Sequence, residues 1–227
     1  MALTSKQLVE SGAHFGENKK KWNPKMKEYI YTERKGFHII DLQKASKMSE
    51  DLYNEVKAVA ETGDVLFVGT KRQASAIIER VATDVEMPFV ANRWLGGMLT
   101  NLKTIQVRIK KLEELEALFA SEDINYYTKK EQMLMTKEME KLTRFLGGIR
   151  NMNVVPKAIF VVDSEKEKNA ILEAKKLGIK VFGIADTNSN PEDFDCFIPA
   201  NDDAIKAIDL ILTNMGEAVA EGTAARQ

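Results

Sequence analysis

The chain has 227 residues, of which 44% are hydrophobic and 30% charged, with a formal net charge of −1. This composition is typical of a soluble globular protein, and no apolar run approaches the roughly 18–20 residues of a membrane helix. A single cysteine, Cys196, excludes an internal disulfide, and two histidines provide no rich set of metal ligands. The start, "MALTSKQLVESG", has no basic region followed by an apolar core, so we expect no secretory signal, no membrane partner and a cytoplasmic location.

Charge is distributed unevenly along the chain. Residues 15–35 hold seven Lys or Arg against three Glu, a local charge of +4. From residue 160 onward there are seven Lys or Arg against thirteen Asp or Glu, a charge of −6. Such asymmetry suggests a polyanionic partner for the first part, although a dipolar surface without a partner is the competing interpretation.

The first notable segment is the N-terminal basic extension around "NKKKWNPKMKEYIYTERK". Its cations could neutralise phosphates, and its aromatic rings could stack on unpaired bases. We predict an arm that lies on RNA and reads base sequence little or not at all. The expected contacts are Lys19, Lys20, Lys21, Trp22, Asn23, Lys25, Lys27 and Arg34.

Short β-branched runs then alternate with segments of helical spacing. This alternation predicts βαβ units and a parallel sheet. We expect Ser164 to cap the helix over 164–178 together with Glu167, Gly178 to end it, and Asn201 or Asp202 to cap the last helix. The expected strands are 64–70, 87–90, 156–163, 179–186 and 195–199, and the expected helices are 71–85, 164–178 and 201–220.

Residues 101–146 interrupt this alternation and carry no strand signal. A first helix has apolar residues from Ile105 to Leu118 at steps of 4, 3, 3 and 3, which is close to a coiled-coil seam. A second helix is expected to present Leu134, Met135, Met139 and Leu142 on one face. We predict an antiparallel coiled-coil hairpin at 101–150, inserted into a discontinuous α/β domain of residues 1–100 and 151–220, and a flexible tail at 221–227.

The residues that follow the predicted strands are the ones that would carry catalytic chemistry in a fold of this class. "VGTKRQAS" lacks the glycine fingerprints of phosphate loops, although Thr70 and Lys71 could still seat an anion at a helix N-terminus. Asp163, Asp186 and Thr187 follow strands, where a substrate or Mg²⁺ could bind, but such residues more often make turns. His14 and His38 lack a nucleophile context and are interpreted as packing residues. We predict no catalytic residue, no cofactor and no metal.

A second group of cations and polar side chains surrounds "NRWLGGMLTNLKTIQVRIKK". Thr and Asn commonly donate to phosphate and sugar oxygens, and an Arg adjoins a Trp here. Together with the basic extension, this group favours RNA binding. The predicted contacts are Lys71, Arg72, Arg93, Trp94, Thr100, Asn101, Lys103, Thr104, Arg108 and Lys111.

Six motifs in order then give a resemblance. "GAHFG" with "WNPKM", "VLFVGTK", "RWLGGMLTN", "LGGI", "FVVD" and "NDDA" closely resemble the family of the second protein of the bacterial small ribosomal subunit, over about residues 3–216. The resemblance implies a three-layer, flavodoxin-like α/β fold with a coiled-coil hairpin insertion. One departure is Glu17, where members often carry histidine.

The resemblance also implies a function. It implies a non-enzymatic protein, a monomer within the ribosome, that binds small-subunit ribosomal RNA near the junction of head and body. It would contact neighbouring proteins and help to recruit ribosomal protein number one, which engages messenger RNA. Two other classes stay open: an enzyme that binds a small phosphate ligand at Thr70, Asp163 and Asp186, and a coiled-coil adaptor without an RNA role.

Overall fold

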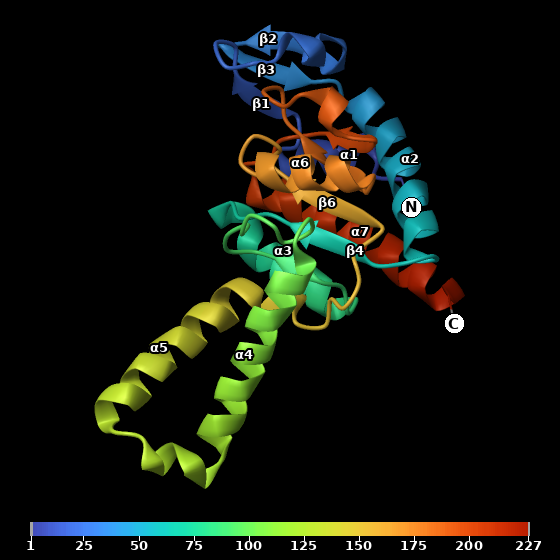
Figure 1. Ribbon diagram of the computed structural model, residues 1–227. Helices are drawn as coiled ribbons and strands as arrows, with labels where there is room; N and C mark the ends of the chain where they lie inside the picture. The colour runs from blue at the N-terminus through green and yellow to red at the C-terminus, as the bar shows by residue number, and fades with distance from the viewer. Residues whose placement is uncertain (1, 227) are drawn as a thin grey trace.

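A five-stranded parallel sheet forms the centre of the molecule (Figure 1). The computed structural model describes residues 2–226. The strand order is β5-β4-β6-β7-β8, which is 2-1-3-4-5 in order along the chain and is the flavodoxin-like order. The parallel sheet expected from the sequence is confirmed. Its strands are β4 (Val65–Val68), β5 (Phe89–Val90), β6 (Ala158–Val162), β7 (Lys180–Ala185) and β8 (Cys196–Pro199).

Helices cover both faces of this sheet, which explains why its strands are apolar throughout rather than alternating. On one face Phe67 and Phe160 pack under α2 (Leu42–Ala60), α3 (Arg72–Asp84) and α7 (Ile205–Arg226). On the other face Leu66 and Ile159 pack under α6 (Lys168–Leu177) and the segment that leads into the hairpin. The three-layer arrangement expected from the sequence is therefore present.

Two helix ends differ from the expectation. Helix α6 begins four residues after Ser164, because the Glu167 carboxylate accepts the backbone N–H of Thr70 at 2.8 Å and cannot fold back as a capping residue. Gly178 ends α6 in the left-handed conformation, as predicted. Helix α7 continues to Arg226, so residues 221–226 of the expected tail are helical, and Gln227 lies outside the described residues. An Arg226–Asp64 ion pair of 3.1 Å joins the end of this helix to the residue before β4.

The basic N-terminal segment is a folded unit rather than an extended arm. After α1 (Ser5–Ser11), the strands β1 (Phe15–Asn18), β3 (Phe37–Ile40) and β2 (Ile30–Arg34) form an antiparallel sheet in that order. The 3₁₀ helix η1 (Pro24–Tyr29) connects the first strand to the second. We call β1, β2 and β3 with η1 the N-terminal sheet. It lies at one end of the molecule (Figure 1).

The N-terminal sheet is attached to the α/β body by backbone contacts. The Glu17 N–H donates to Thr187 Oγ1 at 2.9 Å and to Asp186 Oδ1 at 3.2 Å. The Asn23 N–H donates to the Thr187 carbonyl at 2.8 Å, and the Met26 side chain is fully buried beneath η1. Because these contacts lie at the carboxyl end of β7, the segment is ordered by the body itself.

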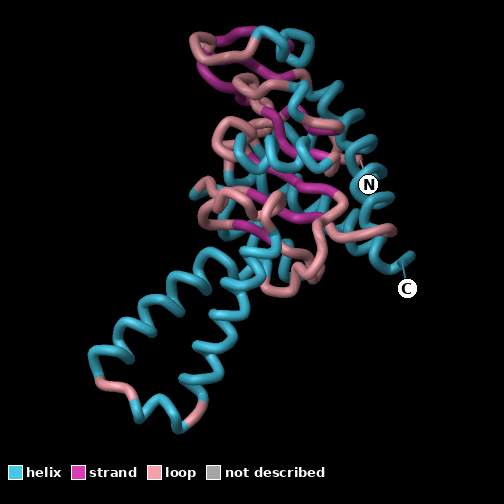
Figure 2. The backbone as a smooth tube through the Cα atoms, in the orientation of Figure 1, coloured by secondary structure: helices cyan, strands magenta, loops and turns pink. Residues whose placement is uncertain are grey.

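A pair of helices extends from the opposite end of the body (Figures 1 and 2). Helix α4 (Leu102–Ala120) leads outward, η2 (Glu122–Tyr126) turns the chain, and α5 (Lys129–Leu146) returns through η3 (Gly147–Ile149). This insertion lies between β5 and β6, where the sequence predicted it. We call α4, η2 and α5 the hairpin. The remaining short helix is η4 (Pro191–Asp193).

The interior of the hairpin differs from a regular coiled coil. Ile109, Leu112 and Leu115 of α4 are buried, as predicted. On α5, however, Leu134 is 56% exposed, and Leu146 at the base is the one fully buried residue. A continuous coiled-coil seam is therefore not confirmed, because the two helices diverge away from the body (Figure 2). Among the described residues, no helix is long and apolar enough to cross a bilayer.

Candidate nucleic-acid interface

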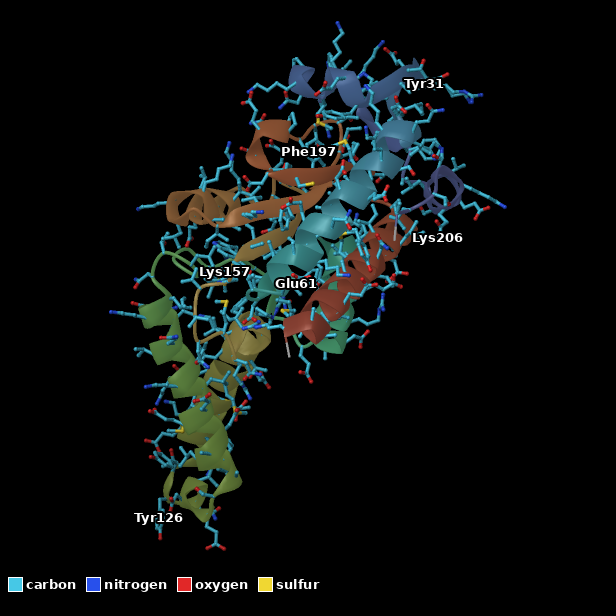
Figure 3. All side chains as sticks on the ribbon, turned by 90° about the vertical axis from the view of Figure 1, so that its right-hand side faces the viewer. Tyr31, Glu61, Tyr126, Lys157, Phe197 and Lys206 are labelled. Atoms are coloured by element: carbon cyan, nitrogen blue, oxygen red, sulfur yellow. The ribbon has the colours of Figure 1, made fainter. Side chains whose placement is uncertain are left out.

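The structure separates the predicted RNA contacts into two main groups. Figure 3 places Tyr31 on the N-terminal sheet and Tyr126 at the tip of the hairpin, at opposite ends of the molecule. The basic segment of residues 19–34 therefore lies far from the hairpin, with the α/β body between them. A third, smaller group, Lys71 and Arg72, lies where β4 runs into α3.

In the N-terminal group, the cations differ in whether they form an ion pair. Lys20, Lys21, Lys27 and Arg34 are exposed and make no ion pair with other described residues. Lys19 Nζ lies 2.8 Å from Glu33 Oε1, and both side chains are about half exposed. Exposed pairs of this kind are weak and open readily, so Lys19 remains available to a phosphate. The neighbouring Lys25 forms a similar pair with Glu192.

The two other predicted residues of this group have structural roles. The Trp22 ring is half-buried and meets the edge of His38, with ring centroids 5.1 Å apart. The Asn23 side chain caps η1 by accepting the Lys25 N–H at 3.0 Å. His38 is buried, which agrees with its interpretation as a packing residue. These contacts fix the turn from which Lys20 and Lys21 project.

At the hairpin base, one carboxylate organises the loop between β5 and α4. Glu173 of α6 accepts the indole N–H of Trp94 at 3.1 Å and the backbone N–H groups of Gly97 at 2.8 Å, Leu99 at 3.1 Å and Thr100 at 3.0 Å. The Thr100 hydroxyl adds a fifth bond at 2.9 Å. Burial raises the pKa of Glu173, but the hydrogen bonds from these donors together lower it by more, so the net shift of the pKa is downward. The carboxylate is therefore ionised and fixes the loop.

Because of this arrangement, Trp94 is not free to stack on RNA. Its side chain is only 9% exposed and belongs to the apolar core beneath the sheet. Arg93, immediately before it, is exposed and makes no ion pair with a described residue. The loop thus turns its tryptophan inward and its arginine outward.

The remaining residues of this group lie along the first part of α4. Lys103 and Arg108 are exposed without an ion-pair partner in the described chain, and Lys111 lies 4.0 Å from Glu114. The Thr104 hydroxyl donates to Asn101 Oδ1 at 2.9 Å, and both residues are exposed. Cations and amide or hydroxyl groups therefore share one exposed stretch near the body.

In the third group, the Lys71 cation is already paired with carboxylates of the same chain. Lys71 Nζ lies 2.6 Å from both Asp202 and Asp203 and 3.3 Å from Asp163. Burial lowers the pKa of Lys71, but these carboxylates raise it more, so the ammonium stays charged. Beside it, the Glu167 carboxylate accepts both the N–H and the hydroxyl of Thr70, at 2.8 and 2.5 Å. Lys71 is thus neutralised, whereas Arg72 is exposed.

This arrangement bears on the alternative of a phosphate-binding enzyme. In this fold, ligands bind at the carboxyl ends of β4 and β6, where the strand order reverses. Here the Thr70 N–H that would meet a phosphate already meets Glu167, and the burial of Glu167 raises its pKa despite the Thr70 bonds. The Asp163 carboxylate accepts the Lys166 N–H at 3.1 Å, the turn contact that its position after a strand indicated.

Two buried carboxyl groups, Asp202 within this cluster and Asp186 beside it, have raised pKa values. Burial raises the pKa of Asp186 to about 6, against hydrogen bonds from Thr187, Asp202 and Glu17 that lower it. Burial and the charge of Asp186 raise the pKa of Asp202 to about 7, despite its contact with Lys71. Asp186 thus anchors the N-terminal sheet rather than presenting a carboxylate to solvent.

Sequence reasoning missed three residues that belong with these groups. Tyr31, 75% exposed on the edge strand β2, was noted only as part of an aromatic pattern. Lys141 and Arg144 of α5 come close to Arg93 and Arg108 only through the hairpin fold. In the sequence of α5 nothing distinguishes these two cations from other exposed lysines and arginines. Only their closeness to the apolar Leu142 and Phe145 could have indicated a site shared with Arg93 and Arg108.

The comparison with known families agrees with the fold and with the distribution of motifs. The family model for Ribosomal protein S2 matches residues 8–222 of the 227. That span includes the N-terminal sheet, the α/β body and the whole hairpin. The chain therefore belongs to the ribosomal protein S2 family, a structural, non-enzymatic family of the small ribosomal subunit that serves translation.

Proposed function

We propose that the chain binds ribosomal RNA of the small subunit near the junction of head and body, in the cytoplasm and as a single copy. The observation that carries this proposal is the set of exposed cations without ion-pair partners among the described residues in two separate regions, the N-terminal sheet and the base of the hairpin. Such cations bind phosphates by releasing counterions and need no base sequence. Lys20, Lys21, Lys27 and Arg34 belong to the N-terminal sheet, and Arg93, Lys103 and Arg108 lie at the base of the hairpin.

The two sites would act together. The distance between the N-terminal sheet and the hairpin lets one protein contact two separate RNA segments (Figure 3). Binding both from one rigid body raises the effective concentration of the second contact once the first is made. The acidic surface contributed by residues from 160 onward is then left for solvent or for protein neighbours.

The test is incorporation into small subunits across a salt series. The triple variant Lys20→Ala, Lys21→Ala and Lys27→Ala removes three exposed cations from the N-terminal sheet. We expect it to dissociate from purified subunits at lower salt than the parent chain and with a shallower dependence on salt. A matched control is Lys47→Ala, Lys168→Ala and Lys176→Ala, which removes three exposed lysines from α2 and α6. Equal retention of both triple variants would refute the proposal.

The hairpin supplies an independent test. Deletion of residues 107–142 removes most of α4 and α5 and leaves the base of the hairpin. We expect weaker incorporation, because the cations Arg108, Lys111 and Lys141 are lost. Normal incorporation at physiological salt would refute a role for the hairpin in RNA binding.

We further propose that the subunit-bound chain helps to recruit ribosomal protein number one. This part of the proposal is supported by family membership alone. The test is a pull-down of tagged chain from lysate before and after nuclease treatment. We expect protein number one to be retained after nuclease if the contact is between proteins. Its loss in parallel with the RNA would overturn direct recruitment.

A further inference from the structure

A small cavity at the hairpin base combines apolar and cationic side chains. It has a volume of about 260 Å³ and lies where the loop after β5, the first part of α4 and the end of α5 meet. Leu95, Leu142, Phe145 and Leu146 form its apolar lining. Arg93, Arg108 and Lys141 complete the lining, one from each of the three segments.

The three cations are free to meet a ligand. All are exposed, and none makes an ion pair with another described residue. Arg93 belongs to the loop whose backbone Glu173 holds by hydrogen bonds to Gly97 and Thr100. A fourth cation, Arg144, lies over the Phe145 ring, 5.7 Å from the ring centroid. Positive charge therefore gathers around one aromatic ring.

We infer that this cavity holds a single unstacked nucleotide of an RNA strand. A nucleotide joins a flat apolar base to an anionic phosphate, and the cavity offers an apolar, aromatic lining with cations at its border. Bases that leave a helix commonly stack on aromatic side chains, while Lys and Arg neutralise their phosphates. The volume lies below the roughly 300–1,000 Å³ of pockets for drug-sized ligands, which suits one base better than a coenzyme.

Other occupants fit less well. A free phosphate would leave the four apolar side chains without a contact. An apolar peptide segment would cover three cations without neutralising them, and buried unpaired charges are costly. The inference rests on the proposed RNA binding and specifies one of its contacts: a base-stacking site rather than a further phosphate contact.

The experiment is photochemical cross-linking in purified small subunits that contain the full chain. Short-wavelength ultraviolet light joins bases to side chains in direct contact. Trypsin cuts after Arg144 and Arg150, so that Phe145 lies in the peptide "FLGGIR". We expect this peptide to carry the mass of a nucleotide. Replacing the ring by Phe145→Leu keeps an apolar lining and should lower the adduct at least about tenfold.

A charge-matched pair of variants separates a pocket from general attraction. Arg108→Ala with Lys141→Ala removes two cations that line the cavity. Lys110→Ala with Lys137→Ala removes two exposed lysines of the same helices that do not line it. We expect the first pair to reduce the adduct on the Phe145 peptide at least about fivefold and the second pair to leave it unchanged.

Each other outcome overturns the inference in a distinguishable way. Nucleotide adducts confined to peptides of the N-terminal sheet would refute the cavity and leave the proposed RNA binding intact. A peptide adduct on "FLGGIR" in place of a nucleotide would assign the cavity to a protein neighbour. If the tagged chain failed to sediment with small subunits at all, the proposed function would fail with it.

Discussion

The N-terminal sheet is basic and the hairpin is nearly neutral overall, with exposed cations near its base, and the two are joined to the α/β body by different kinds of contact. The N-terminal sheet is fixed by polar contacts to the end of β7, above all from Glu17 to Thr187 and Asp186. The hairpin is fixed by apolar packing of Ile105 and Leu146 beneath the sheet and by the loop around Glu173. Beyond this base, its helices have few buried side chains.

The difference indicates where a rigid RNA contact can form. Cations of the N-terminal sheet project from a turn that hydrogen bonds hold on the body. Cations at the hairpin base are held equally well, because the core continues into the first turns of α4. Residues near the hairpin tip lack such support, and Tyr126 there is 88% exposed. The base, rather than the tip, is therefore the part preorganised for binding.

The largest effect is expected from Gly148→Ala at the hairpin base. A Cβ at residue 148 would lie 2.4 Å from the Phe89 carbonyl oxygen and 2.7 Å from the Phe89 ring. Because a backbone carbonyl in a strand cannot move aside, we expect the free energy of unfolding to fall by about 3 kcal/mol. Denaturant unfolding measures this change.

The adjacent glycine provides the control for this prediction. A Cβ at Gly147 would have its nearest contact at 3.9 Å, with Thr143, and the residue has helical dihedral angles. Gly147→Ala should therefore leave stability unchanged or raise it slightly. Equal destabilisation by both substitutions would show that the hairpin base does not depend on the close approach of Gly148 to β5.

A second prediction concerns the carboxylate that organises the loop after β5. Glu173→Ala leaves five donors without their acceptor, but most of them can reach water. We expect a loss of about 2 kcal/mol in the free energy of unfolding. Glu173→Gln should cost about half as much, because the amide retains one acceptor oxygen. A Glu173→Ala chain as stable as the parent would contradict the assigned role of Glu173.

The third prediction concerns the dependence of stability on pH. Asp186, which anchors the N-terminal sheet, is titratable. The pKa values of Asp186 and Asp202 are raised to about 6 and about 7, above those of an unfolded chain. The folded state therefore binds more protons than the unfolded state between about pH 4 and pH 7, and stability falls as pH rises through this window. We expect the free energy of unfolding to decrease between pH 4 and pH 8.

The variant Asp186→Asn isolates this effect. The amide oxygen can still accept the Thr187 and Glu17 N–H groups, but the side chain no longer titrates. Its stability should change less between mild acid and mild alkali than that of the parent. Parallel pH profiles for the two chains, measured by denaturant unfolding, would assign the dependence to other groups.

The smallest effect is expected from Gly16→Ala in β1. The added Cβ would lie 2.6 Å from the Thr187 Cγ2 methyl group and 2.9 Å from Thr187 Oγ1, so the buried Thr187 side chain would have to shift. We expect a loss of about 1 kcal/mol. Thr187→Ser removes that methyl and keeps the hydroxyl that accepts the Glu17 N–H, so it should recover part of the loss. A double variant less stable than Gly16→Ala alone would rule out this clash as the cause.

The parallel sheet could be predicted from the sequence because each strand is a short apolar run between helices. The N-terminal sheet could not. Its strands are four or five residues long, and β2 carries Tyr31, Glu33 and Arg34 on an exposed edge, which gives no alternating pattern. These strands form because Asp186 and Thr187, about 170 residues later, hold them on the body.

Partners that lie far away in the sequence also limited the prediction of the RNA contacts. Trp94 could be read as a stacking ring because its partner, Glu173, is 79 residues away in the sequence. Lys71 could be read as a free cation because the carboxylates that neutralise it belong to residues 163 and 202–203. Lys20 and Arg93 are exposed, and their predicted contacts with RNA stay a prediction.

The charged side chains that meet one another at the carboxyl ends of β4 and β6 have a consequence for folding. In many proteins of this topology a bound metabolite contributes to stability, so that the folded fraction rises and falls with the supply of that metabolite. Here the Glu167 carboxyl group accepts the Thr70 N–H that a bound anion would otherwise meet. Lys71 and its three aspartates occupy the remainder of that ligand position. The chain thus carries its own substitute for a ligand. It therefore needs no bound metabolite at these strand ends to hold Thr70 and Lys71 in place.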